Sequence, residues 1–164
     1  MMRVKRVLLL LVGMVWFVGC SSEEPMKQQS SFIVFKTPTL RYADMGFVST
    51  GASKVDVEIY SSGHVAMKMR LSKESVCFST WECLSSGAFN QKVLSAAYPE
   101  GLLFHIFRHE ALFDGENRVN VRNGFTQHLR KEGLYNIEYR VLNHETSFRD
   151  TINHITIKIK RIAS

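Results

Sequence analysis

The chain has 164 residues, of which 45% are hydrophobic and 22% are charged, with only three prolines and ten glycines. This composition is typical of one folded domain and excludes a disordered or collagen-like chain. The formal net charge is +6, but three of the 21 basic residues lie in the first six positions, so residues 20–164 carry 18 Lys and Arg against 15 Asp and Glu. A balance this close to neutral does not indicate a nucleic-acid-binding protein.

The first twenty residues have the organisation of an export signal. Residues 1–6 are basic, residues 7–18 are apolar, and Gly19 and Cys20 follow. A transmembrane helix needs about 20 apolar residues, so this segment is short for a permanent span and is typical of a signal peptide. An ordinary secretory signal and an uncleaved N-terminal anchor are the alternatives to a lipoprotein signal, and in both Cys20 is only a small residue near the membrane interface.

Residues 17–20, Phe-Val-Gly-Cys, resemble the lipobox of bacterial lipoproteins, although Phe17 stands where leucine is usual. The resemblance implies that residues 1–19 are removed and that Cys20 becomes the lipidated, palmitate-carrying N-terminus. Each acyl CH₂ placed in a bilayer contributes about 0.8 kcal/mol, so several chains give a stable membrane anchor. Ser21, rather than Asp, follows the cysteine, which in enteric bacteria directs lipoproteins to the outer membrane. We therefore expect a lipid-anchored outer-membrane protein whose domain lies in the periplasm or at the cell surface.

The lipidated cysteine is expected to head a flexible tether, residues 20–31, because residues 21–31 contain a single apolar side chain, Met26. One β-rich domain is then expected over residues 32–164, since no internal repeat or second core is present.

Alternation of apolar and polar residues dominates this domain and predicts half-buried strands. The pattern is clearest in residues 54–60 and 64–71, which the turn residues Ser61-Ser62-Gly63 join into a hairpin. Similar alternation predicts strands at residues 118–122, 134–142 and 154–162.

Two segments between these strands have helical spacing instead. Residues 98–109 place Pro99 near the start of a helix with an apolar face, and residues 87–94 fit a shorter helix. The predicted fold is mainly β (α+β), an antiparallel sheet curved as a half-barrel with one or two helices on its concave face. A β-sandwich is the alternative.

Two cysteines besides Cys20, Cys77 and Cys83, are expected to form a disulfide. An exported chain enters an oxidising compartment, and the five intervening residues can close a small ring. Such a local ring contributes about 2 kcal/mol at most. A redox pair or half of a metal site is the alternative, but both normally use the shorter Cys-x-x-Cys spacing.

The sequence offers little for catalysis. We find no nucleophile elbow, phosphate-binding loop, dinucleotide glycine pattern or spaced acidic pair. His105 and His109 stand four residues apart, a spacing that zinc sites use, but the His-Glu-x-x-His pattern is absent, and we interpret the two histidines as polar residues that flank an apolar helix face. We therefore expect a non-enzymatic protein without a metal or cofactor.

The order of lipobox, tether, antiparallel strands, central helix with Tyr98-Pro99-Glu100-Gly101-Leu102-Leu103, and a final Ile-Thr-Ile-Lys-Ile-Lys-Arg-Ile strand resembles the lipoprotein carriers LolA and LolB. The chain is also similar to small outer-membrane lipoproteins of Gram-negative, epsilon-class bacteria, a grouping that implies no activity. The carrier resemblance implies a concave apolar face that binds acyl chains or other lipoproteins. Flexible methionines and aromatic residues suit such a ligand, although they suit an ordinary core as well. The candidate cavity wall comprises Val57, Ile59, Met67, Met69, Leu103, Phe107, Ile137 and Tyr139.

A different function, an adhesin-like surface module or outer-membrane scaffold, is favoured by the charge of the C-terminal segment. Residues 118–164 carry nine Lys and Arg against four Asp and Glu. Lys158, Lys160 and Arg161 form the candidate basic patch, which could meet anionic headgroups or an acidic partner. The alternative for this patch is a solvated face that protects an edge strand.

Overall fold

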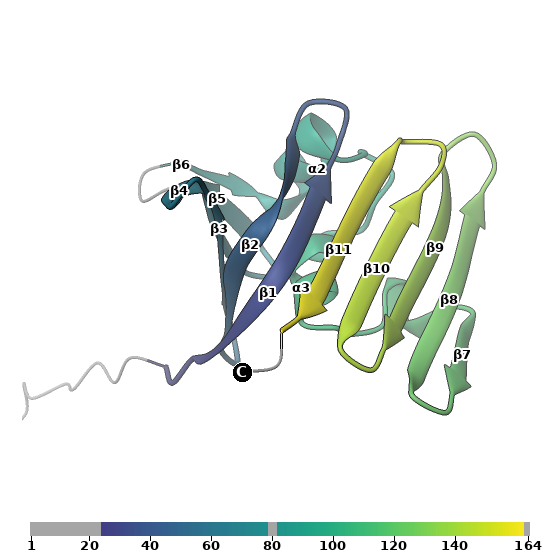
Figure 1. Cartoon of the computed structure of the whole chain (residues 1–164). Coiled ribbons are helices and arrows are strands. Elements are labelled where there is room, and N and C mark those ends of the chain that lie inside the picture. Colours follow the sequence, from purple (N-terminus) through teal and green to yellow (C-terminus); the bar gives the residue numbers. More distant parts are fainter. Residues whose placement is uncertain (1–23, 79–81, 163–164) are drawn as a thin grey trace, which may run out of the picture.

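The protein folds as one open antiparallel sheet of eleven strands with two helices (Figure 1). The computed structural model describes residues 24–78 and 82–162, and all statements about the fold concern these residues. The strands are β1 (Lys27–Lys36), β2 (Arg41–Thr50), β3 (Val55–Ser61), β4 (His64–Leu71), β5 (Ser75–Phe78), β6 (Glu82–Ser85), β7 (Arg118–Val121), β8 (Gly124–Lys131), β9 (Tyr135–Leu142), β10 (Glu145–Asp150) and β11 (Ile155–Arg161). The helices are α2 (Ser86–Val93) and α3 (Leu102–Phe107), and a 3₁₀ turn spans Phe113–Gly115.

Strand order explains where the helices lie. The order across the sheet is β6-β5-β4-β3-β2-β1-β11-β10-β9-β8-β7. Strands that follow each other in sequence are therefore neighbours, except β6 and β7, which form the opposite edges, and β1 pairs in addition with β11. The chain from β6 to β7, which contains both helices, must cross from one edge of the sheet to the other.

The crossing takes place on the inner side of the curved sheet, where both helices lie (Figure 1). Five of the six residues of α3 are buried there, in one core with the inward side chains of both halves of the sheet. The prediction of a half-barrel with helices on its concave face is confirmed. The alternative of a β-sandwich is wrong, because all eleven described strands belong to one sheet.

Alternation in the sequence corresponds to alternation of burial in the strands. Every second residue of β3 is fully buried, beginning with Val55, and Met67, Met69 and Leu71 are buried in β4. Ser62 and Gly63 adopt positive φ values of 52° and 81° between these strands, the conformation that a tight hairpin requires. The predicted hairpin is confirmed.

The N-terminal boundary differs from the prediction. Strand β1 begins at Lys27, so residues 27–31 of the predicted tether belong to the sheet. These residues pair along β2, from Lys27 opposite Thr50 to Ser31 opposite Gly46. Backbone hydrogen bonds rather than apolar burial hold this end of β1. Its side chains are therefore polar, and the composition of residues 27–31 does not indicate a strand.

The predicted helix at residues 98–109 is shorter in the structure, covering only Leu102–Phe107. Gly101 has a φ of 72° and His109 a φ of 60°, a left-handed conformation that an α-helix cannot contain. The second predicted helix, residues 87–94, is confirmed as α2, and the Ser85 hydroxyl caps it by accepting a hydrogen bond from the Ala88 N–H at 3.2 Å.

A buried carboxylate, Asp150, joins the helical crossing to the C-terminal half of the sheet. It accepts hydrogen bonds from the Tyr98 hydroxyl at 2.5 Å, the Asn153 side-chain amide at 2.7 Å and the backbone N–H of Ile152 at 2.9 Å. Burial raises the pKa of Asp150, but the hydrogen bonds from Asn153 and Tyr98 outweigh it and hold the pKa below its ordinary value.

We predict that Asp150→Asn lowers the free energy of unfolding by about 2–3 kcal/mol, because charge-assisted hydrogen bonds are lost while the buried donors remain. The native pKa lies below the ordinary value of 3.8, so the contribution of Asp150 is complete above that pH and is lost as the pH falls through the native pKa. Urea unfolding of both proteins at several pH values measures the difference, which should shrink towards acid. Exposed Asp114 provides the control, since Asp114→Asn should change little. If the difference in the free energy of unfolding between the two proteins did not change with pH, the stabilising role of the Asp150 carboxylate would be contradicted.

Candidate functional site

The interior of the half-barrel is filled by the protein's own side chains. All eight candidate cavity residues are buried, none more than 5% exposed, and they belong to one core. Of the eight, only Met67 lines one of the hollows described below. The others serve as core residues, because α3 and its flanking loops occupy the concave space that an acyl chain would need.

An apolar hollow opens instead at the end of the sheet where β1 turns into β2. Its volume is about 490 Å³, within the range of small-molecule sites. We call it the apolar groove. It is lined by Thr39, Leu40, Tyr42, Ala66, Met67, Lys68, Phe78, Lys92 and Val93.

The apolar groove exists because β2 and β3 separate. They pair from Thr50 opposite Val55 to Gly46 opposite Ile59, and residues 41–45 of β2 then pair only with β1. The register of β3 and β4 shifts between Ile59 and Tyr60, an irregularity that bends strands away from their neighbours. Gly46 stands at the point of divergence, where a Cβ would overlap the carbonyl oxygen of Glu58.

Two lysines stand among the lining side chains. Lys68 forms an ion pair with Glu58 at 2.6 Å, and its ammonium group lowers the pKa of that carboxyl. Lys92 comes from the last turn of α2 and also lines an adjoining hollow of about 450 Å³ that reaches Cys83 and Leu84. Apolar walls with ammonium groups beside them can hold a chain that carries an anionic head.

Sequence reasoning found only Met67 among the groove residues. Leu40 lies in a turn, Phe78 ends a short strand and Ala66 occupies the irregular part of β4. These residues come close together because β2 diverges from β3, and no periodic pattern in the sequence indicates that divergence. Tyr42, on the inward face of β2 opposite Phe35, is the one residue that alternation could have added.

The predicted disulfide between Cys77 and Cys83 is confirmed. The two residues are directly opposite each other in β5 and β6, with Cα atoms 3.9 Å apart. The bond therefore ties edge strand β6 to β5 beside the adjoining hollow.

The candidate basic patch is divided between the two faces of the sheet. Lys158 and Lys160 are exposed on the convex face, whereas Arg161 is opposite fully buried Ser31 and lines a hollow on the concave side. The suggestion that these residues protect an edge strand is wrong, because β11 is paired on both sides, with β1 and β10.

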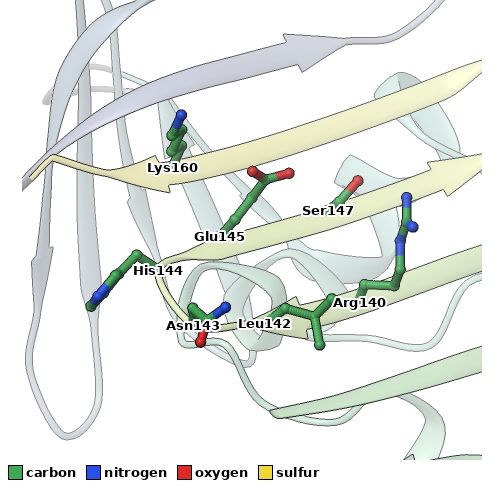
Figure 2. A pocket seen from close by; sticks show the side chains of 7 residues that line it. All are labelled: Arg140, Leu142, Asn143, His144, Glu145, Ser147 and Lys160. Carbon is green, nitrogen blue, oxygen red and sulfur yellow. The ribbon is translucent and has the colours of Figure 1, made fainter. Parts of the chain in front are cut away.

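Lys160 contributes to a depression of about 360 Å³ on the convex face (Figure 2). Figure 2 shows Glu145, Ser147 and Arg140 on the neighbouring strands, with His144 at the turn between β9 and β10. Charges of both signs line this depression, so it is suited to polar contacts rather than to an apolar ligand.

The two histidines of the helical segment have different partners. His105 Nδ1 lies 2.8 Å from a carboxylate oxygen of Glu110, and His109 Nδ1 lies 2.6 Å from the Thr146 hydroxyl. His109 also follows the end of α3, so the two rings do not share a helical face. Within residues 24–78 and 82–162, no group of three or more His, Cys, Asp or Glu side chains is arranged to hold a metal ion.

The predicted lipidation residue, Cys20, lies outside the described residues. In the described part of the chain, no helix has the length and apolarity needed to cross a membrane. No protein-family model matches the sequence, and no curated protein sequence matches it.

We predict that replacing both cysteines, Cys77→Ser with Cys83→Ser, lowers the free energy of unfolding by about 2 kcal/mol or less, because the ring that the disulfide closes is short. Urea unfolding measures the loss, and intact mass before and after reduction checks the bond in the parent protein. Unfolding of the whole domain in the double variant would contradict a local role.

Proposed function

We propose that this protein is a lipid-anchored lipoprotein of the cell envelope that binds acyl chains, free or attached to another lipoprotein, without catalysing a reaction. The observation that carries the proposal is the apolar groove, formed where β2 leaves β3 and lined by Leu40, Tyr42, Met67, Phe78 and Val93. The half-barrel with helices on its concave face supports a role like that of the lipoprotein carriers LolA and LolB. The site proposed here is the open end of the half-barrel rather than its filled interior.

The chemistry of the groove suits an acyl ligand. Met67 and the ring of Phe78 provide adaptable and flat apolar surfaces, and Lys92 supplies a positive charge for a carboxylate or phosphate head. Burial of apolar ligand surface contributes about 25 cal/mol per Å², so most of the affinity should come from the chain and its orientation from the lysine.

We predict that residues 21–164, exported to a periplasm and purified without detergent, carry a lipid of a few hundred daltons detectable by native mass spectrometry. Ala66→Trp should fill the groove without disturbing the core, because Ala66 lines the groove and is exposed. The variant should lose the bound mass and weaken oleate binding by about tenfold or more, equivalent to about 1.4 kcal/mol.

The neighbouring residue provides a matched control. Val65 is 50% exposed but does not line the groove, so Val65→Trp should keep both the bound mass and the oleate affinity. A clean apo mass together with no oleate binding at micromolar concentration would contradict the proposal. That result would favour the interaction module, for which exposed Phe32 and Met45, facing each other across β1 and β2 beside Lys160, provide the surface.

The anchor is tested separately from the groove. We predict that the full chain incorporates labelled palmitate in a Gram-negative host and fractionates with the outer membrane, and that Cys20→Ser abolishes the labelling. Ser21→Ala is the matched control and should keep the label. Palmitate labelling that survives Cys20→Ser would contradict the assignment of Cys20.

A further inference from the structure

The inward face of β1 changes character along its length. Ile33 and Phe35 are fully buried in the core, whereas the inward positions at the other end of the strand are Lys27, Gln29 and Ser31. These polar residues border a small hollow of about 180 Å³, which we call the basic pocket. It lies at the opposite end of β1 from the apolar groove, so the two sites do not share residues.

Positive charge gathers in the basic pocket from three elements. Lys27 comes from β1, Arg161 from the end of β11, and Arg108 from the residue that follows α3. Among the described residues, no carboxylate forms an ion pair with Lys27 or Arg161. Arg108 is paired with Glu110 at 2.7 Å, so the positive charges without a carboxylate partner in the basic pocket are those of Lys27 and Arg161, which a bound anion would offset.

Arg108 is held in place by the surrounding chain. Its Nε donates to a Glu110 carboxylate oxygen at 2.7 Å, and its Nη1 donates to the carbonyl oxygens of Gly51 and Ala52. A guanidinium fixed by such contacts is already oriented for a ligand and loses little conformational freedom on binding.

The Ser31 hydroxyl is the observation that points most directly to a ligand. Ser31 is fully buried, lines the basic pocket, and its Oγ has no hydrogen-bond partner in the described structure. A buried hydroxyl without a partner is costly and rare in native proteins. An oxygen atom of a bound anion would accept its hydrogen bond.

His109 also lines the basic pocket, and its ring carries no charge near pH 7. Its Nδ1 lies beside the Thr146 hydroxyl, and no described residue bonds its Nε2. Burial, together with nearby Arg161, lowers the pKa of His109 to about 4, so the ring is neutral near pH 7. It therefore adds no positive charge to the basic pocket.

We propose that the basic pocket binds a phosphate group through Arg108, Arg161, Lys27 and the Ser31 hydroxyl. Two guanidinium groups and an ammonium group from separate elements can address several oxygens of one tetrahedral anion, and the small volume suits such an anion rather than a large ligand. The phosphate can come from free phosphate or from a phosphomonoester headgroup. The second source rests on the proposed anchor, because Lys27 follows Cys20 by only seven positions in the sequence.

The test is isothermal titration of the full chain, in a non-ionic detergent, with inorganic phosphate and with glycerol 3-phosphate. We expect saturable binding of inorganic phosphate at millimolar concentration or below. Tighter binding of glycerol 3-phosphate would identify a headgroup as the source, and equal or weaker binding would identify the free phosphate. Absence of saturable binding of both compounds overturns the proposal.

Variants separate a built site from general surface charge. Arg161→Gln should weaken binding by about tenfold, a loss of about 1.4 kcal/mol, whereas Lys158→Gln, on the same strand but the convex face, should leave it unchanged. An equal loss in both variants overturns the proposal.

A thermal measurement gives a second readout that does not depend on titration heats. Ser31→Ala removes an unpaired hydroxyl, so without phosphate its Tm should equal or exceed that of the parent chain. Phosphate should raise the Tm of the parent by mass action but raise that of Ser31→Ala much less. An equal rise in both proteins shows that the hydroxyl does not contact the anion and overturns its assignment. Both readouts are independent of oleate binding, so this proposal can fail while the proposed function stands.

Discussion

The pairing of β1 with β11 is the contact on which the architecture depends. Each half of the sheet is a meander of neighbouring strands, and this pair joins the two halves into one surface. Because the N- and C-terminal strands meet in the middle, the edges of the sheet are β6 and β7, both only four residues long. The segment between these edges must cross the sheet, and burying its apolar side chains requires it to cross on the concave face.

The core fills the concave side of the sheet, so the candidate sites lie towards the ends of the strands. Leu102, Leu103 and Phe107 of α3 occupy the centre, and the Tyr98–Asp150 hydrogen bond fixes the entry to this helix against the C-terminal half. The two proposed sites are the apolar groove, where β2 diverges from β3, and the basic pocket, at the polar end of β1. The two hollows differ in chemistry because apolar side chains such as Leu40, Met67 and Phe78 line the first, whereas Lys27, Arg108 and Arg161 line the second.

Period-two geometry also explains why a run of basic residues in sequence does not make one surface. Lys160 and Arg161 are adjacent in the chain, yet successive strand residues point to opposite faces. Lys160 therefore joins the convex depression, and Arg161 lines the basic pocket together with Arg108 and His109. Counting charges along the sequence therefore overestimated the basic patch on the convex face and missed the basic pocket on the concave face.

The sequence by itself determined the local features: the alternation of β3, β4, β9 and β11, the hairpin at Ser62-Gly63, helix α2 and the Cys77–Cys83 disulfide. Each depends on residues close together in the chain, whose periodicity, turn chemistry or spacing can be read directly. Only the tertiary structure decided that β1 starts at Lys27, that the eight candidate cavity residues form the core, and that Ser31 meets Arg108 and Arg161. The start of β1 depends on the pairing of residues 27–31 with β2. The other outcomes depend on the pairing of β1 with β11 and on the path of α3, which bring together residues far apart in the chain, and no local pattern encodes such contacts.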